Sequence, residues 1–255
     1  DVRDFQVGDR VFGYIPTSNV PGADVDRQGT YADHVVSRTD RLAHLPESVT
    51  FETGAAVAAV GVTAWKALVT HGDVKAGESC VIHGGTGGVG HVAVQLASAM
   101  GCHVVTTASG TEKRQRALAF GADDVIDYAR ADLETALIET VPTPPTLVLD
   151  HMVGEYLPLD VDVVSRRGTI AVVGGVGDSL ALDSVAAAML KNVTIVPFTV
   201  SLTQDIQYVL NRLARLMATE QLSVVVAETF PLKAVAEAQR TVVNESFVGK
   251  IVMTP

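Results

Sequence analysis

The chain has 255 residues, of which 47% are hydrophobic, and a formal net charge of −10 at pH 7. This acidic balance argues against a nucleic-acid partner, because binding to phosphates needs clustered Lys and Arg. The hydrophobic runs are short of the ~20 residues that a membrane span needs, so no membrane association is predicted. The length allows a sizeable core in one or two domains.

Two cysteines, Cys80 and Cys102, stand in or beside predicted strands, and the sequence has no C-x-x-C pair. A buried free cysteine behaves as a small hydrophobe, so the pair indicates neither a redox motif nor a zinc knuckle. We therefore expect a reducing compartment and a cytoplasmic location. The chain begins "DVRDFQVGDR", without a charged and then apolar leader, so no secretory signal is expected.

Residues 1–57 have the character of strands and loops. Val11, Tyr31 and Val35–Val36 lie in β-prone segments, and residues 18–29 (SNVPGADVDRQG) predict a polar connecting loop. A helical pattern then covers residues 45–68, and its first turn could be capped by Ser48 or Thr50, since hydroxyl oxygens accept unpaired N–H groups.

Strand and helix patterns alternate regularly from Cys80 onward. The strand candidates are nearly continuous Val/Ile/Leu runs, which is typical of parallel strands that are buried on both faces. Six such strands in βα order predict a doubly wound, parallel Rossmann sheet of the α/β class. The predicted strands are 80–84, 103–108, 124–128, 146–150, 169–175 and 193–198. After Phe198 follow an amphipathic helix and then a strand, a helix and a strand, at 205–220, 226–232, 235–243 and 249–255.

The segment "HGGTGGVG" carries the G-x-G-x-x-G pattern at Gly85, Gly87 and Gly90, with Gly84 and Gly88 added. It follows a predicted strand and opens a predicted helix, which is the context that a dinucleotide-binding turn requires. The helix start at Gly88–Val89 would offer free N–H groups to a diphosphate. The alternative is a glycine-rich turn with a packing role only, and the six strands favour the dinucleotide.

The second predicted strand ends in "TTASGTEKR", without the acid that usually binds the ribose 2′-hydroxyl of NAD. Ser109 stands near that position, and Lys113 and Arg114 follow within one turn of helix. A hydroxyl and a cation would bind a 2′-phosphate that a carboxylate would repel, so the segment predicts NADPH. The alternative for Lys113 and Arg114 is a solvated helix face.

Four segments carry a family resemblance: "GVTAWKAL", "VIHGGTGGVGHVAVQLASAMG", "ALAFGADDVIDY" and "GKIVM". They resemble the zinc-free quinone oxidoreductases of the medium-chain dehydrogenase/reductase superfamily, over essentially the whole chain. The resemblance implies a partial GroES-like, β-rich catalytic domain at residues 1–57, completed by a C-terminal return at 200–255, and an NADP(H)-binding Rossmann domain at 58–199. It also implies that the first part of the catalytic domain is absent from this chain, and that the nicotinamide binds between the two domains.

The same resemblance implies the coenzyme contacts, position by position. Thr63 would face the nicotinamide carboxamide, and Gly87, Gly88 and Val89 would meet the diphosphate. Ser109, Lys113 and Tyr128 would surround the 2′-phosphate. The nicotinamide half would be lined by Val173, Gly174 and Phe198 and approached by Lys250. Tyr128 and Phe198 could alternatively be ordinary core aromatics. Ser246 stands where the family often has an Arg, which places that contact in doubt.

No metal is predicted. Zinc alcohol dehydrogenases of the same superfamily carry a ligand cysteine where this chain has Ala59, and a catalytic zinc needs three protein ligands. His44, His71 and His103 are isolated in the sequence. No general acid is assigned either: Tyr31 and His34 fit packing or solvated roles better, and Asp150 fits a structural role that caps nearby backbone.

The predicted function is therefore an NADPH-dependent, zinc-independent transfer of hydride to a quinone or an α,β-unsaturated carbonyl. One alternative is a coenzyme-binding structural or regulatory protein with little turnover; another, disfavoured by Ala59, is a zinc alcohol dehydrogenase relative. The apolar strand at residues 192–198 would be an edge of the sheet, and exposed edges invite pairing, so a homodimer joined there is expected.

Overall fold

The computed structural model describes residues 2–16, 29–130, 132–175 and 181–255. The loop predicted at 18–29 lies outside these residues except for Gly29. The chain divides into two units. We call Thr63–Phe198 the sheet unit, and we call the other the split unit because it combines Asp1–Val62 with Thr199–Pro255.

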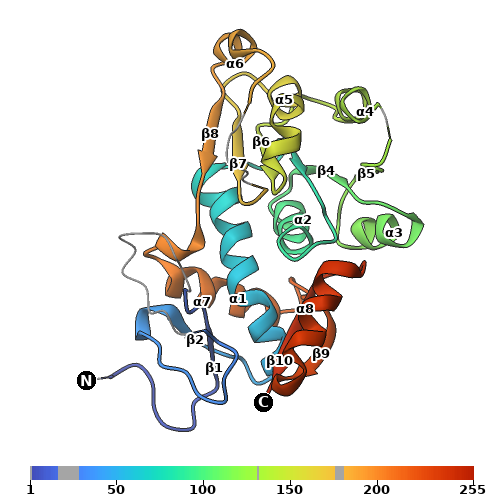
Figure 1. Cartoon of the computed structure of the whole chain (residues 1–255). Coiled ribbons are helices and arrows are strands. Elements are labelled where there is room, and N and C mark those ends of the chain that lie inside the picture. The colour runs from blue at the N-terminus through green and yellow to red at the C-terminus, as the bar shows by residue number, and fades with distance from the viewer. Residues whose placement is uncertain (1, 17–28, 131, 176–180) are drawn as a thin grey trace. The chain divides into compact units, whose positions relative to one another are not determined.

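Six strands, all paired in parallel, form the sheet of the sheet unit (Figure 1). Their order across the sheet is β5-β4-β3-β6-β7-β8, which is the doubly wound order of a Rossmann fold. The α/β prediction is thus confirmed. The strands are β3 (Ser79–Ile82), β4 (His103–Thr107), β5 (Asp124–Ile126), β6 (Leu147–Asp150), β7 (Thr169–Val172) and β8 (Thr194–Pro197).

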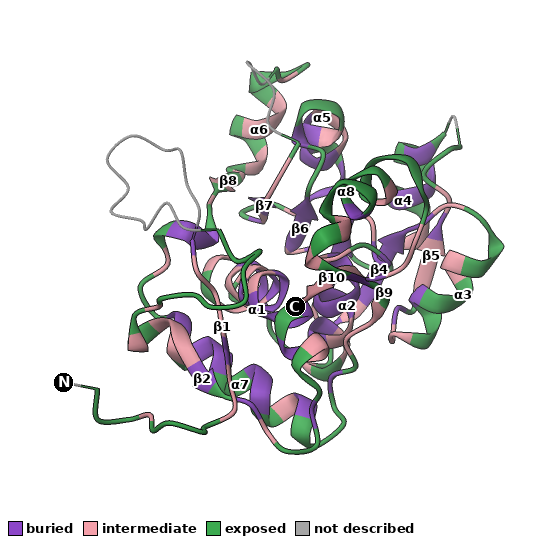
Figure 2. Cartoon of the chain, turned by 60° about the horizontal axis from the view of Figure 1, so that its bottom comes forward, coloured by how far each residue is buried: buried purple, intermediate pink, exposed green. Residues whose placement is uncertain are grey.

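Helices connect these strands, as parallel pairing requires. They are α2 (Gly90–Ala99), α3 (Thr111–Ala119), α4 (Leu133–Thr140), α5 (Val153–Val163) and α6 (Val185–Lys191). Figure 2 shows β4, β6 and β7 buried, whereas α3 and α6 are mostly exposed. All four residues of β3 are buried as well.

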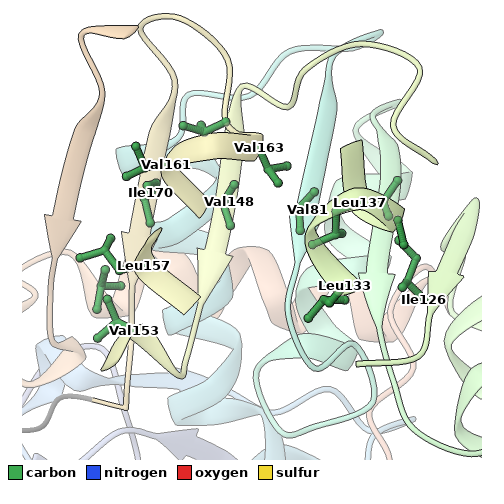
Figure 3. Packing of buried hydrophobic residues seen from close by; sticks show 14 residues of the cluster. Val81, Ile126, Leu133, Leu137, Val148, Val153, Leu157, Val161, Val163 and Ile170 are labelled. Carbon is green, nitrogen blue, oxygen red and sulfur yellow. The ribbon is translucent and has the colours of Figure 1, made fainter. Parts of the chain in front are cut away.

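Both faces of the central strands are buried. On one face, Val81 and its neighbours Val148 and Ile170 pack against Leu137 of α4 and Leu157 of α5, as Figure 3 shows. On the opposite face, Leu147 lies beside Gly72, at the end of the π-helical segment η2 (Lys66–His71). Because side chains alternate along a strand, burial on both faces explains why these strands read as continuous apolar runs.

Helix α1 (Phe51–Trp65) begins at the predicted cap, because the Thr50 hydroxyl accepts the N–H of Thr53 at 3.1 Å. Together with η2 it spans 21 residues with a mean hydropathy of 1.3, which is long and apolar enough to cross a membrane. The sequence analysis did not anticipate a run of this length. More than half of its most apolar window is buried within the protein, as in the core helix of a folded domain.

The split unit contains two small sheets among its described residues. Strands β1 (Val11–Gly13) and β2 (Leu42–His44) pair antiparallel, and β9 (Val226–Pro231) and β10 (Lys250–Thr254) pair in parallel around α8 (Val235–Asn244). The predicted amphipathic helix is α7 (Ile206–Ala218), which packs on β2 and the turn η1 (Thr39–Arg41). Short helical turns also occupy η3 (Val200–Leu202) and η4 (Leu232–Ala234).

Two strand expectations are corrected. Residues 29–38 contain no strand, and Tyr31, Val35 and Val36 are exposed. A strand needs a neighbour to satisfy its N–H and C=O groups, and no described segment pairs with this one. The predicted edge strand at 192–198 is shorter in the structure, because Asn192 adopts a left-handed conformation (φ +54°) that caps α6. The strand itself is indeed at the edge of the sheet.

Leu137 tests the packing of α4 on the sheet. Its side chain is fully buried, so Leu137→Ala is expected to lower the free energy of unfolding by about 2–5 kcal/mol. Ile138, the next residue on the helix, is 49% exposed, and Ile138→Ala should change stability by only about 0.5 kcal/mol. Urea unfolding followed by circular dichroism measures both values. Equal losses in the two variants would contradict the described packing.

Candidate functional site

The strand order locates the site. From β3, the chain proceeds outward through β4 and β5 on one side and through β6, β7 and β8 on the other. In such sheets ligands bind beyond the carboxyl ends of the strands where the order reverses, which here lies between β3 and β6. Ile82 ends β3 and Asp150 ends β6, so the glycine turn that follows β3 lies at this point.

Backbone hydrogen bonds tie the glycine turn to the neighbouring strand β4. The N–H of Gly85 donates to the Thr107 carbonyl at 3.0 Å, and the N–H of Gly84 donates to the Thr107 hydroxyl at 3.0 Å. The N–H of Gly87 donates to the Gly84 carbonyl at 2.9 Å and closes the turn. Gly87 therefore uses its own N–H inside the turn. Its contribution to a binding site is the space that its missing side chain leaves.

Close packing explains the glycines at two positions. A Cβ atom on Gly90 would overlap the Gly84 carbonyl oxygen, so only glycine lets helix α2 start this close to the turn. Gly84 itself has φ +67°, a conformation that side chains disfavour. The turn is thus built for a close approach of backbone to backbone.

Four N–H groups of the turn remain for a ligand. Within the described residues, the N–H groups of Thr86, Gly88, Val89 and Gly90 donate no hydrogen bond. Helix α2 begins at Gly90, one or two residues later than predicted, and its positive end faces the same turn. Free N–H groups at a helix start bind phosphate, so the turn fits a diphosphate.

The structure brings Ser109 and Tyr128 together beyond the end of β4. The Ser109 Oγ and the Tyr128 hydroxyl are 2.8 Å apart and hydrogen-bonded. Tyr128 is 43% exposed, which contradicts the alternative of an ordinary core aromatic. Lys113 lies in the first turn of α3, three residues after Gly110, and is half-buried. The two hydroxyls form a polar pair suited to a phosphate, and a contribution of the Lys113 ammonium group stays a prediction.

The residues predicted for the nicotinamide half also follow strand ends. The Val173 N–H donates to the Asp150 carbonyl at 2.8 Å, and the Phe198 N–H donates to the Val172 carbonyl at 3.2 Å. The Phe198 ring packs on the His71 ring, with centroids 4.6 Å apart. Gly174 lies close to the His151 carbonyl, where a Cβ atom would be 3.0 Å from the oxygen.

Thr63 and Lys250 come from other segments of the chain. Thr63 is half-buried on α1 at the first position of the sheet unit. Lys250 belongs to the split unit, where it opens β10 and donates its N–H to the Val225 carbonyl at 2.9 Å. Their predicted contacts with a coenzyme stay predictions.

The sequence analysis missed a buried ionisable trio, His83, Asp150 and Asp160, which is at most 2% exposed. The His83 Nε2 lies 2.8 Å from Asp160 Oδ1, and Asp150 Oδ1 accepts the Met152 N–H at 2.6 Å. The structural role considered for Asp150 is thereby confirmed. A signal existed for Asp160: it lies on the same helix stripe as Val153, Leu157 and Val164, where an apolar residue is expected.

Burial dominates the electrostatics of the trio. It raises the pKa of Asp160 to about 8. Burial, with the nearby Asp160 charge, raises the pKa of Asp150 to about 7. It lowers the pKa of His83 to about 4. Each shift favours the uncharged form, because a low-dielectric interior disfavours charge on any side chain.

The split unit has a hollow of its own. It has a volume of about 860 Å³ and is lined by residues 29–32 and 34–36, which include Tyr31 and His34. Both side chains are exposed, and Gln239 of α8 donates to the Tyr31 hydroxyl at 3.4 Å. Neither residue has a neighbour there that marks it as a general acid.

Among the described residues, no group of three or more His, Cys, Asp and Glu side chains is placed to hold a metal ion. His44, His71 and His103 stand on separate elements. Ala59 offers no ligand atom from its side chain.

Comparison with known proteins indicates the family to which the chain belongs. The "Zinc-binding dehydrogenase" family model matches residues 88–215. A quinone oxidoreductase of Pongo abelii is 30% identical over 253 residues, which cover 98% of this chain and 73% of that protein.

Two solved structures extend the comparison to the fold. The quinone oxidoreductase of Pseudomonas syringae pv. Tomato DC3000 has a TM-score of 0.84 at 28% identity, over 98% of this chain and 76% of that one. Mycobacterial Rv1454c, solved in complex with NADPH, has a TM-score of 0.77 at 25% identity, over 85% of this chain and 68% of that one.

The doubly wound sheet with its glycine turn is that of an oxidoreductase of the medium-chain dehydrogenase/reductase superfamily. Within this superfamily, the chain belongs to the quinone oxidoreductase family.

Proposed function

We propose that this chain is an NADPH-dependent, zinc-independent oxidoreductase that transfers hydride to a quinone or an α,β-unsaturated carbonyl compound. The observation that carries the proposal is the glycine turn with its four free N–H groups, together with the Ser109–Tyr128 pair beyond the next strand. When bound, the reduced coenzyme supplies the hydride, and the residues of the chain bind and orient it.

The turn and the hydroxyl pair would hold the two ends of the adenosine half. The N–H groups of Gly88, Val89 and Gly90 suit the diphosphate, because the helix dipole adds to their hydrogen bonds. Ser109, Tyr128 and Lys113 suit the 2′-phosphate, since no carboxylate stands between Val104 and Thr111 to repel it. The NADPH complex of mycobacterial Rv1454c supports this choice by analogy.

The available ligands support the proposed zinc independence. Ala59 stands where zinc-dependent members carry a cysteine, and the described residues offer no cluster of ligands. The negative charge that develops on a substrate carbonyl would then be stabilised by hydrogen-bond donors or water. We assign no proton donor.

A cytoplasmic location fits the cysteines. Cys80 and Cys102 are buried and free, which is the usual state in a reducing compartment. The net charge of −10 suits a small-molecule enzyme better than a nucleic-acid-binding protein.

A homodimer joined at β8 is the proposed assembly. β8 forms an edge of the sheet, and the adjoining helix α6 exposes Val185, Met189 and Leu190. An unpaired edge flanked by apolar side chains favours pairing with a second copy.

Activity tests the central proposal. We expect loss of NADPH absorbance when the protein meets a panel of quinones and enones, at a rate that a metal chelator does not change. The alternative function, coenzyme binding without turnover, predicts binding of NADPH but no oxidation by any acceptor. A rate that a chelator abolishes and zinc restores would contradict zinc independence.

Coenzyme preference tests Ser109 and Lys113. Ser109→Asp places a carboxylate where the 2′-phosphate is proposed to bind. The affinity for NADPH should therefore fall by about tenfold or more relative to the affinity for NADH. Lys113→Ala should act in the same direction, because it removes a charge-assisted bond. Arg116→Ala is the matched control, since that guanidinium lies in the last turn of α3, over the Phe120 ring. Binding of both coenzymes is measured by calorimetry. If Lys113→Ala and Arg116→Ala behave alike, Lys113 belongs to a solvated helix face.

Light scattering tests the dimer. The native protein should have about twice the chain mass of 26.8 kDa, and Met189→Glu should shift it toward the monomer by placing charge in the interface. Val243→Glu alters an equally exposed apolar residue on α8 and should leave the mass unchanged. A native monomer would count against the proposed interface.

A further inference from the structure

The buried trio lies directly behind the glycine turn. His83 is the residue between β3 and Gly84, and its N–H donates to the Leu149 carbonyl of β6 at 3.1 Å. Its ring packs on Tyr156 of α5, with centroids 4.7 Å apart. The position of the turn therefore depends on contacts that His83 makes with β6 and α5.

The trio also holds the other segments at this edge of the sheet. Asp150 fixes the chain after β6 through the Met152 N–H, and its carbonyl accepts the Val173 N–H after β7. His151 then presents its ring to Gly84, so closely that a Cβ atom there would lie 2.6 Å from Cε1. One cluster thus braces the glycine turn and the segment predicted to face the nicotinamide.

The hydrogen bonding of the trio requires a proton. His83 Nε2 and Asp160 Oδ1 lie 2.8 Å apart, and a hydrogen bond between them requires a proton on one of the two atoms, while the charge of Asp160 acts on the neighbouring Asp150. Asp150 Oδ2, Asp160 Oδ2 and His83 Nδ1 are buried and have no hydrogen-bond partner among the described residues. Buried polar atoms without partners are rare, so their concentration here needs an explanation.

We infer that His83, Asp150 and Asp160 are positioning residues that share a proton behind the glycine turn, and that binding of the coenzyme diphosphate is coupled to uptake of a proton by this trio. This inference rests on the proposed function. The diphosphate adds negative charge at the turn, and negative charge favours the protonated form of a nearby carboxyl group.

The sign of the pH dependence follows from linkage. In the free protein the two carboxyl groups lose protons near pH 7 and 8, according to the pKa values given above. The bound coenzyme would raise these pKa values further. Between the free and bound values the complex holds more protons, so the affinity falls as the pH rises. A shift of one pKa unit changes the affinity by a factor of about ten.

The groups that face the trio come from two segments. They are His151 after β6 and Tyr156 on α5, and Tyr156 is itself affected by Glu155 on α5 and by Tyr128 from the segment after β5. Burial lowers the pKa of His151 and raises the pKa of Tyr156, so neither group gains charge between pH 7 and 8. The aspartates of the trio are the groups expected to titrate there.

The test measures how many protons the protein takes up when it binds the coenzyme. NADPH is titrated into the native protein by calorimetry at pH 7.5, in buffers of different ionisation enthalpy, and its affinity is followed from pH 6.5 to 9. We expect net proton uptake and about a three- to tenfold loss of affinity across this range. In Asp160→Asn both effects should be clearly smaller, because only Asp150 of the two aspartates still titrates, whereas Asp162→Asn, which changes an exposed aspartate on the same helix, should keep them in full. Any titration of the coenzyme itself is common to all three proteins and cancels in the comparison.

The other possible results also test the inference. Binding with equal proton exchange in the native protein and in Asp160→Asn overturns the inference and leaves the proposed function intact. No binding of NADPH or NADH at any pH overturns both. If Asp160→Asn does not fold, Asp150→Asn replaces it. If neither folds, the native protein decides alone: binding without proton uptake overturns the inference.

Discussion

The contact between the start of helix α2 and the Gly84 carbonyl is the constraint on which the site depends. Only a residue without a side chain fits at Gly90, so helix and turn approach each other as bare backbone. That approach leaves the N–H groups of Thr86, Gly88, Val89 and Gly90 without internal partners. A packing requirement and a binding surface are thus the same feature. A side chain at Gly90 would push the helix away from the turn and spoil both.

The sheet gives this contact its place. Parallel pairing of β3 with both β4 and β6 sets the glycine turn beside the ends of two strands, and each neighbour supplies something different. From β4 come the Thr107 bonds to the turn and, two residues later, Ser109. From β6 comes Asp150, which joins the buried trio. The coenzyme site proposed here therefore combines polar groups from β4 and the segment after it with the buried ionisable trio beneath the glycine turn.

The sequence was sufficient for the features that repeat or that have a local pattern. The continuous apolar runs predicted parallel strands, and the glycine spacing predicted the turn, because each pattern reflects nearby residues only. The contact between Ser109 and Tyr128 was implied by family resemblance alone, since helix α3 and strand β5 lie between them in the sequence. Asp160 was overlooked because a helix stripe shows where a side chain points but not which polar groups it meets. The strands expected at Tyr31 and Val35 failed for a related reason, since propensity cannot supply a pairing partner.

The position of Thr107 affects which ligands could contact both ends of the proposed site. Its carbonyl and hydroxyl anchor the turn, and Ser109 follows two residues later, just beyond the end of the strand. The anchor of the glycine turn and the proposed phosphate contact at Ser109 therefore lie within two residues of one another at the end of one strand. A ligand whose anionic groups had a different spacing would reach the glycine turn or Ser109 but not both. The end of β4 would therefore select ligands by the distance between their anionic groups.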